Sequence, residues 1–432
     1  MAKANISKLI NRRIWQLSWP MMLSNLCIPL LALTDTFVLG HLPEASSLAG
    51  VTIAANLFVS IVWVFGFLRM GTTSVVARSD RTEHALLLTD TLRLSAVIAI
   101  PILTLFALFG PHLIALYGAP AQVANEAWQY LAVRSISIPL VLMNYALLGW
   151  FIGRQDSRTP MLVLIGSNLV NIILDIWWVL GLGWGVVGAA LATVVADSLA
   201  FLICVLAVRF KHLISPLNLI VAPLSNSGER WAELFKVNSH LFARTIFILA
   251  VFAYITAAGA KFGEVVLAAN AIILQLLAVA AYGLDGIANA TESMVGRFSR
   301  YKNTWLRNIA INQTGRWSAA MAIAFSMILI ISQGVVVNGI TSIEGVRNML
   351  NIYYPWVWLL PIASFASYWY DGVCLGLGRT DLMLKSMAVA VAIFSVFQIV
   401  VDSNHQLLMS LVLFNAVRGI AQWYLLKTDK SN

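Results

Sequence analysis

Apolar residues fall into twelve long runs that short polar segments separate. The hydrocarbon core of a bilayer is about 30 Å thick, so a helix that crosses it needs roughly 20 apolar residues. The runs have about this length and predict twelve membrane-spanning helices. Their limits are 14–40, 48–68, 88–109, 123–150, 161–181, 186–208, 239–260, 265–295, 309–333, 346–376, 383–401 and 406–426.

Composition agrees with a membrane protein. The chain is 60% hydrophobic and 11% charged, with a mean hydropathy of +0.82. A soluble protein would carry about a quarter charged residues. The basic start, "MAKANISKLINRRIWQLSWP", resembles a signal peptide, but the apolar run is too long and no A-x-A-like site closes it. We therefore expect an all-α integral membrane protein whose first run is a membrane helix.

The net charge of +9 follows an orientation pattern that does not indicate a nucleic-acid partner. If the N-terminus is cytoplasmic, the outer loops hold only Lys261 and Arg347, whereas the inner segments hold most of the other Lys and Arg residues. Cytoplasmic loops of membrane proteins carry such an excess. Both termini are therefore predicted to be cytoplasmic.

The chain divides into two halves. Segment 211–236 is the longest polar stretch, so we expect a cytoplasmic linker there, between an N-lobe at 1–210 and a C-lobe at 237–432. The halves repeat each other, because "GTTSVVAR" (71–78) matches "ATESMVGR" (290–297). Likewise, Gly149-x-x-x-Gly153 precedes Arg158-Thr159, as Gly372-x-x-x-Gly376 precedes Arg379-Thr380.

Each repeat holds six predicted helices, so both lobes share one orientation in the membrane. This is typical of a parallel repeat about a pseudo-two-fold axis along the membrane normal, an architecture of transporters. Chance similarity between apolar segments is the alternative.

Three stretches carry a family resemblance: "FGFLRMGTT" (65–73), "LAANAIILQLLAVAAYGLDGIANATESMVGR" (267–297) and "YDGVCLG" (370–376). With them, the chain resembles the MATE (multidrug and toxic compound extrusion) family and its DinF-like branch over essentially its whole length. The resemblance implies a twelve-helix antiporter that expels amphipathic, mostly cationic drugs and dyes in exchange for H⁺ or Na⁺. We expect a monomer in a bacterial inner membrane.

Two acids are predicted at one depth in the outer half of the N-lobe. Asp35 lies about five residues, or roughly 7–8 Å, from the outer end of its helix, and Asp175 lies at a similar depth. Asn168, Asn171 and Asp175 follow the spacing i, i+3, i+7 and form one polar stripe. The resemblance agrees, since DinF-like members carry an acid at Asp35 and an Asn-x-x-x-Asp at Asn171 and Asp175.

Neighbouring helices bring further polar groups to this region. Thr193 and Tyr130 are expected at about the same depth. Asp197 follows Thr193 by one helical turn, and it either lines the cavity or pairs with a neighbour. A polar cluster that only holds helices together is the structural alternative.

The acids suggest a coupling mechanism. Two carboxylates that lie close together in a low dielectric cannot both ionise cheaply, so the pair is predicted to take up a proton and release a cationic drug. The oxygens of Asp35, Asn171, Asp175 and Thr193 also suit Na⁺.

Pro20 and Pro29 interrupt the first helix. We expect this helix to be the element that bends on protonation, and a static kink is the alternative.

The C-lobe carries a second polar set towards the inside. Tyr282, Asp285, Asn289 and Glu292 follow one another along 265–295, and Asp371 lies within 346–376. Arg69 occupies a near-equivalent place in the N-lobe. An Asp285–Arg69 pair that closes the inner face is one interpretation, and a static ion pair is another. NorM-like members place an acid in the seventh helix as part of a Na⁺ site, and 239–260 has none.

Other functions find little support. "GWGVVG" (183–188) fits G-x-G-x-x-G but follows a membrane helix rather than a strand. No ATP-binding loop, H-E-x-x-H or paired Cys motif is present, so neither an enzyme nor a cofactor is expected. The loop "VVARSDRTEHA" departs from the major-facilitator motif. A flippase of the same superfold that carries a lipid-linked precursor remains the second interpretation.

Overall fold

The computed structural model describes residues 2–40, 45–212 and 228–429. Within these ranges, the side chains of 2–5, 26–37, 39–40, 45, 212 and 228–230 lie outside the description. All described elements are helices, and the described part of the chain contains no strand. The prediction of an all-α protein is confirmed.

Contacts divide the chain into two compact units. The N-terminal unit is Leu23–Phe235, and the C-terminal unit combines Met1–Met22 with Lys236–Asn432. Helix α1 (Ala2–Gly40) therefore contributes its first half to the C-terminal unit and its second half to the N-terminal unit.

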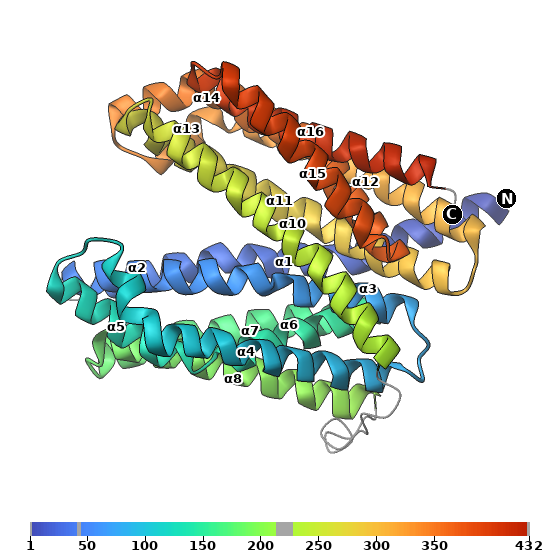
Figure 1. Cartoon of the computed structure of the whole chain (residues 1–432), viewed down its shortest axis with the longest axis horizontal. Coiled ribbons are helices and arrows are strands. Elements are labelled where there is room, and N and C mark those ends of the chain that lie inside the picture. Colours follow the sequence, from blue (N-terminus) through green and yellow to red (C-terminus); the bar gives the residue numbers. More distant parts are fainter. Residues whose placement is uncertain (1, 41–44, 213–227, 430–432) are drawn as a thin grey trace. The chain divides into compact units, whose positions relative to one another are not determined.

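The N-terminal unit is a bundle of long helices, three of which are interrupted (Figure 1). Besides α1, its elements are α2 (Ala45–Trp63), η1 (Val64–Gly66), α3 (Phe67–Arg78), α4 (His84–Ala115), α5 (Ala121–Ser135), α6 (Ile138–Gly153), α7 (Arg158–Asp175), η2 (Ile176–Gly181) and α8 (Gly185–His212). Here η1 is a 3₁₀ turn and η2 a π-helical segment. A 51° bend separates α5 from α6, and Pro139 lies in the first turn of the second helix.

The C-terminal unit is built in the same way. Its elements are α10 (Gly228–Ala260), α11 (Glu264–Arg300), α12 (Thr304–Ile331), α13 (Gln333–Ile340), α14 (Glu344–Leu377), α15 (Thr380–Phe397), η3 (Gln398–Val400) and α16 (Asn404–Thr428). With neighbouring pieces joined, the described part of the two units contains twelve long helical segments, one on each predicted run.

Local sequence accounts for several helix ends. Asn303 accepts a hydrogen bond from the backbone of Leu306 at the start of α12, and Ser403 and Gln406 form a capping box at the start of α16. Helix α14 ends where Gly378 adopts a left-handed conformation, with φ at 73°. Glycine adopts this conformation without steric cost, so it terminates helices readily.

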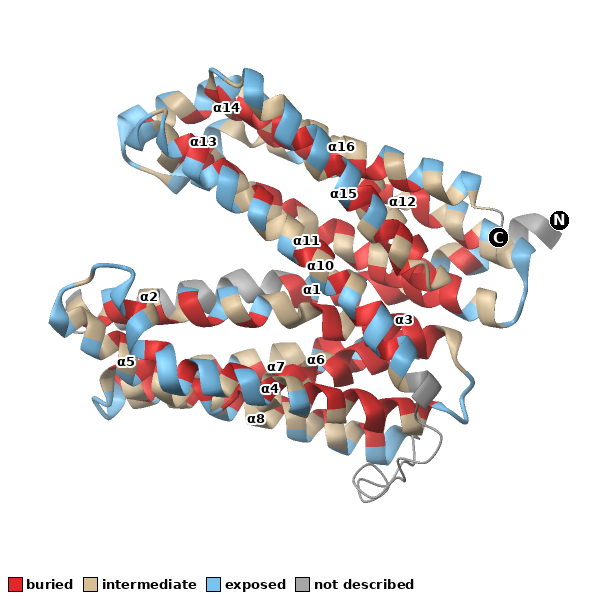
Figure 2. Cartoon of the chain, in the orientation of Figure 1, coloured by how far each residue is buried: buried red, intermediate tan, exposed pale blue. Residues whose placement is uncertain are grey.

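The helices suit a bilayer. Among the described residues, eight segments are long and apolar enough to span it, or nine if bent α5 and α6 form one span. Only 22–39% of each such stretch is buried inside the protein, so most of its residues keep some exposed surface, which lipid could cover. Burial follows one side of many helices (Figure 2).

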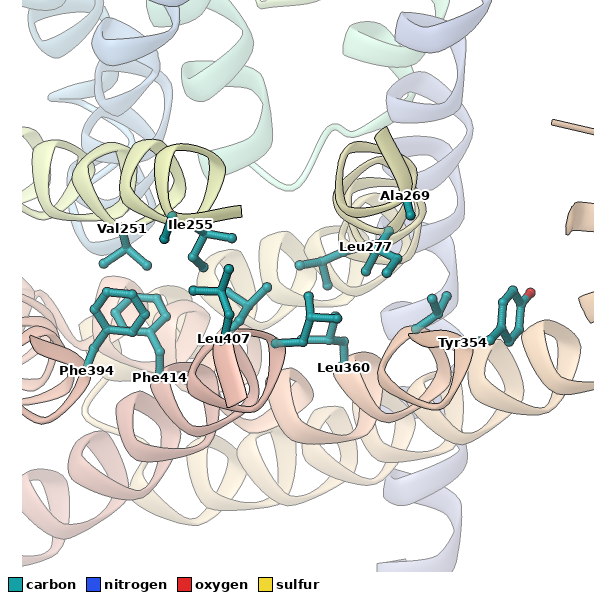
Figure 3. Packing of buried hydrophobic residues seen from close by; sticks show 14 of the residues in the cluster. Val251, Ile255, Ala269, Leu277, Tyr354, Leu360, Phe394, Leu407 and Phe414 are labelled. Atoms are coloured by element: carbon teal, nitrogen blue, oxygen red, sulfur yellow. The ribbon is translucent and has the colours of Figure 1, made fainter. Parts of the chain in front are cut away.

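An apolar core holds the C-terminal unit together (Figure 3). It joins buried side chains of six helices, including Val251 and Ile255 of α10, Leu360 of α14 and Phe414 of α16. The phenol of Tyr354 lies at its edge and donates a hydrogen bond to the carbonyl of Leu329, at 3.0 Å. The buried hydroxyl is thus satisfied within the protein, as hydrocarbon surroundings require.

The first half of α1 packs against α11 and α12. The Trp15 and Trp317 rings meet edge to face at 5.0 Å, and Gln313 donates a hydrogen bond to the Ser7 hydroxyl at 2.8 Å. Gly286 of α11 lies directly against Met22. These contacts explain why the beginning of the chain belongs to the C-terminal unit.

The internal sequence repeat corresponds to the same helix–helix contacts in both units. In the N-terminal unit, Gly149 lies against the carbonyl of Arg69; in the C-terminal unit, Gly372 lies against the carbonyl of Ala288. The aligned motifs pair Arg69 with position 288. Small residues let helix backbones approach closely in membranes. In both units, the glycine contacts a residue at the matching position of the repeat.

The second glycine of each motif follows the same rule. A Cβ atom on Gly153 would lie 2.9 Å from the Cβ of Val76, and one on Gly376 would lie 2.7 Å from the Cβ of Val295. Val76 and Val295 are matching positions of the repeated motifs. Equal contacts at equal positions argue against chance similarity between the halves.

Replacement of Gly372 by Ala should destabilise the protein. The new methyl group would collide with the carbonyl of Ala288, which belongs to a helix backbone and cannot turn away. Overpacking of this kind costs about 1–3 kcal/mol. Thermal unfolding of detergent-solubilised protein, followed by size-exclusion chromatography, should show a lower midpoint.

Gly166→Ala is the matched control, because nothing lies within 4 Å of the added Cβ. Alanine favours a helix over glycine by about 1 kcal/mol, so this variant should unfold at the same or a higher temperature. Equal midpoints for Gly372→Ala and Gly166→Ala would contradict the tight contact.

Candidate functional site

A buried polar stripe runs along α7. Asn171 and Asp175 are 1% and 2% exposed and lie one helical turn apart. The amide of Asn171 donates a hydrogen bond to the Thr193 hydroxyl on α8, at 3.2 Å. That hydroxyl donates in turn to the carbonyl of Ala189, at 3.1 Å. The structure therefore brings together Asn171 and Thr193, as expected from their depth.

Asp175 is the last residue of α7, and the helix continues from Ile176 as the π-helical segment η2. Such segments are rare and occur frequently at functional sites. A charged group within a membrane is costly, so a buried carboxylate at a change of helix type is a strong candidate for function.

The other residues predicted for this site lie on α1, α5 and α7, and some of their side chains lie outside the description. Tyr130 of α5 is buried, and Asn168 of α7 is half-buried. Helix α1 includes Pro20, which is buried, as well as Pro29 and Asp35. The side chains of Pro29 and Asp35 lie outside the described part of the structure.

Asp197 forms an ion pair. Its carboxylate lies 2.6 Å from Nη1 of Arg134, which comes from the end of α5 at the bend. The guanidinium carbon lies 4.2 Å from the centre of the Phe58 ring. Asn144 donates a hydrogen bond to the backbone carbonyl of Asp197, at 3.0 Å. Of the two roles left open for Asp197, the structure has the pairing with a neighbour.

A second buried acid is Asp371 of α14, which is 4% exposed. Arg244 of α10 and Arg418 of α16 both contact its Oδ2 atom, Arg418 at 3.0 Å. Gln422 of α16 donates a hydrogen bond to Oδ1 at 2.6 Å. Three helices thus meet at one buried carboxylate.

The remaining C-lobe residues are distributed along α11. Glu292 is 2% exposed, whereas Asp285 and Tyr282 are half-buried. Arg69 is half-buried on α3, in the other unit. The suggested pairing of Asp285 with Arg69 stays a prediction.

Sequence reasoning missed four side chains that contact the buried acids: Arg134, Arg244, Arg418 and Gln422. Each lies inside a predicted apolar run. An ionisable residue within a membrane usually pairs with another one. The acids in the apolar runs were therefore a signal that basic partners lie in other runs. Within the described residues, no group of three or more His, Cys, Asp or Glu side chains could hold a metal ion.

Comparison with known proteins relates the chain to transporters. Residues 20–177 match the family model MatE. The chain is 33% identical over 425 residues to DNA damage-inducible protein F of Escherichia coli, an alignment that covers 95% of this chain and 91% of that protein.

Solved structures share the fold. A Vibrio cholerae MATE transporter matches with a TM-score of 0.87 at 18% identity, over 99% of both chains. A transporter of the MOP superfamily from Pyrococcus furiosus matches with a TM-score of 0.86 at 20% identity, over 97% of both chains. The predicted twelve-helix transporter fold is confirmed by these likenesses.

The relative in Escherichia coli is similar over almost the whole of both chains, and the family model matches independently. The expected resemblance is thereby confirmed. The chain belongs to the MATE (multidrug and toxic compound extrusion) family, in its DinF-like branch, and is a multi-span membrane transporter rather than an enzyme.

Proposed function

We propose that this protein is a secondary active efflux antiporter of a bacterial inner membrane. It exports amphipathic, mostly cationic organic compounds in exchange for H⁺. The observation that carries the proposal is the buried stripe of α7, where Asn171 bonds Thr193 and Asp175 follows one turn later. A membrane-buried carboxylate of this kind is suited to exchange a proton against a cation.

The coupling step uses Asp35 and Asp175 as a pair at similar depth. Ionisation of one carboxylate opposes ionisation of the other in a low dielectric, so the pair holds a proton readily. Uptake of a proton from outside removes negative charge and weakens the attraction for a cationic compound. Each inward charge contributes about 2.3 kcal/mol per 100 mV of membrane potential, enough to drive modest accumulation outside.

Na⁺ is the second candidate ion, and one observation favours it. The Asn171 Oδ1 atom is buried and accepts no hydrogen bond within the described residues, so it is available as an oxygen ligand. Asp35, Asp175 and the Thr193 hydroxyl would supply the others, since carbonyl, carboxylate and hydroxyl oxygens suit hard cations.

Helix α1 is proposed as the moving element. Pro20 and Pro29 each remove a backbone hydrogen bond and permit a bend. Protonation of Asp35 on the same helix would change its hydrogen bonds and bias the bend. We further propose two six-helix lobes at 1–210 and 237–432, joined by the linker 211–236, in a monomer with both termini cytoplasmic.

A flippase for a lipid-linked precursor is the alternative function. Its precursor would be anionic, and the observation in its favour is the buried pair of Arg244 and Arg418 around one acid. The Pyrococcus furiosus relative is described as having a binding pocket of reverse polarity that suggests a different function. The buried acids of the N-terminal unit favour cationic cargo.

Replacement of Asp175 by Asn should abolish proton-driven efflux. The amide keeps the size of the side chain but cannot take up or release a proton. In sealed vesicles, a pH gradient should drive dye efflux by the wild type and leave efflux by Asp175→Asn and Asp35→Asn at background. A Na⁺ gradient alone should drive no efflux by the wild type or by either variant.

The matched control is Asp381→Asn, which removes an acid whose ion pairs with Arg379 and Lys385 are partly exposed. It should transport at the wild-type rate. Efflux driven only by Na⁺ would indicate that the same site couples transport to Na⁺ instead of H⁺. Undiminished efflux by both N-terminal variants would contradict the proposed coupling site.

Replacement of Pro29 by Ala should lower efflux and leave dye binding intact, because it restores a backbone hydrogen bond and stiffens α1. Transport and equilibrium binding of the same dye, measured side by side, check this. Pro101→Ala is the control, since Pro101 also lies inside a membrane helix but is exposed. Equal transport by the two variants would indicate a static kink.

A further inference from the structure

The cluster around Asp371 carries more positive than negative charge. Arg244 and Arg418 both contact one carboxylate, and the third partner, Gln422, is neutral. Both arginine side chains are less than 10% exposed, at 8% and 4%. Excess charge is costly to bury, so the cluster favours the approach of a further anion.

The cluster also has hydrogen-bond donors to spare. A guanidinium carries five N–H groups in a planar fork that fits a carboxylate at two points. Within the described residues, Arg244 and Arg418 each donate one hydrogen bond, and both reach the Oδ2 atom of Asp371. The Nε atoms of both arginines are buried and have no partner there. An incoming carboxylate would therefore find unused donors.

One side of the cluster reaches the surface of the unit. The Tyr368 ring lies 5.5 Å from the Arg418 guanidinium carbon, and Asp285 interacts electrostatically with both side chains. Tyr368 and Asp285 are half-buried, unlike the arginines. An ionisable group inside a membrane faces the bundle interior or a water-filled cavity rather than lipid. The side of Asp285 and Tyr368 is therefore the side from which a ligand would reach the cluster, and Asp285 partly balances its charge.

The internal repeat gives an independent indication. Thr380 follows Thr159 by 221 positions, and the same step leads from Asp197 to Arg418. Gly372 follows Gly149 by 223 positions, and the same step leads from Tyr145 to Tyr368. The two units thus keep a tyrosine at matching positions but exchange an acid for a base, so the C-terminal unit suits a ligand group of opposite charge.

We propose that Arg244, Arg418 and Gln422 form a site for the carboxylate of a zwitterionic amphiphile. The ligand would direct its carboxylate towards these donors and keep its cationic group away from the two arginines. This inference rests on the proposed export of amphipathic compounds and narrows their chemical class. Asp285 competes with the ligand for the arginines.

Two forms of one dye test the site. A rhodamine with a free carboxylate is zwitterionic, and the ethyl ester of the same rhodamine is cationic. Fluorescence polarisation with purified protein in neutral detergent measures the affinity for each. Arg418→Gln should weaken the affinity for the free acid about tenfold or more, because it removes charge-assisted hydrogen bonds. Its affinity for the ester should equal that of the wild type. Arg418→Lys should recover part of the loss.

Asp285→Asn should act in the opposite direction. It removes the competing acid and should tighten binding of the free acid while the ester binds no better. A change of opposite sign cannot come from general loss of structure, so this variant tests the site even where Arg418→Gln does not fold.

The outcomes separate this inference from the proposed function. If the wild type binds both dyes and the variants change neither affinity, or change both equally, the carboxylate site is wrong and the export function stands. If the wild type binds neither dye, the export function and this site both fail. Competition by phosphatidylglycerol but not phosphatidylcholine would support the anion site and assign it to a lipid head group.

Discussion

Hydrocarbon offers no hydrogen-bond partner, so every polar group within the membrane needs one inside the protein. The backbone meets this requirement by remaining helical through nearly the whole described chain. Charged side chains meet it by pairing between helices: Asp197 joins α8 to Arg134 of α5, and Asp371 joins α14 to α10 and α16. The same pairs that satisfy buried charge therefore determine which helices must stay together.

In both units, the close contact between helices at the second motif glycine involves a polar residue. The carbonyl of Thr73 lies against Gly153, and at the matching position the carbonyl of Glu292 lies against Gly376. One half thus has a hydroxyl where the other has a buried acid. The repeat thus keeps the close backbone approach and varies the side chains beside it.

Hydropathy predicted the twelve helical segments because a bilayer demands long apolar runs. Depth and helical spacing also predicted that Asn171 and Thr193 would meet. They could not predict the partners of Asp197 or Asp371, because depth gives a residue's height in the membrane and not the direction in which its helix is turned. The π-helical segment after Asp175 was missed for another reason, since no residue pattern in 176–181 departs from an ordinary helix.

The division of α1 between the two units has a consequence for biosynthesis. The residues that the ribosome makes first, such as Ser7 and Trp15, find their partners on α12, which is made much later. The C-terminal unit therefore cannot complete its packing until the beginning and the end of the chain have both entered the membrane. A gene cut within the linker would encode two fragments, neither of which contains a whole unit.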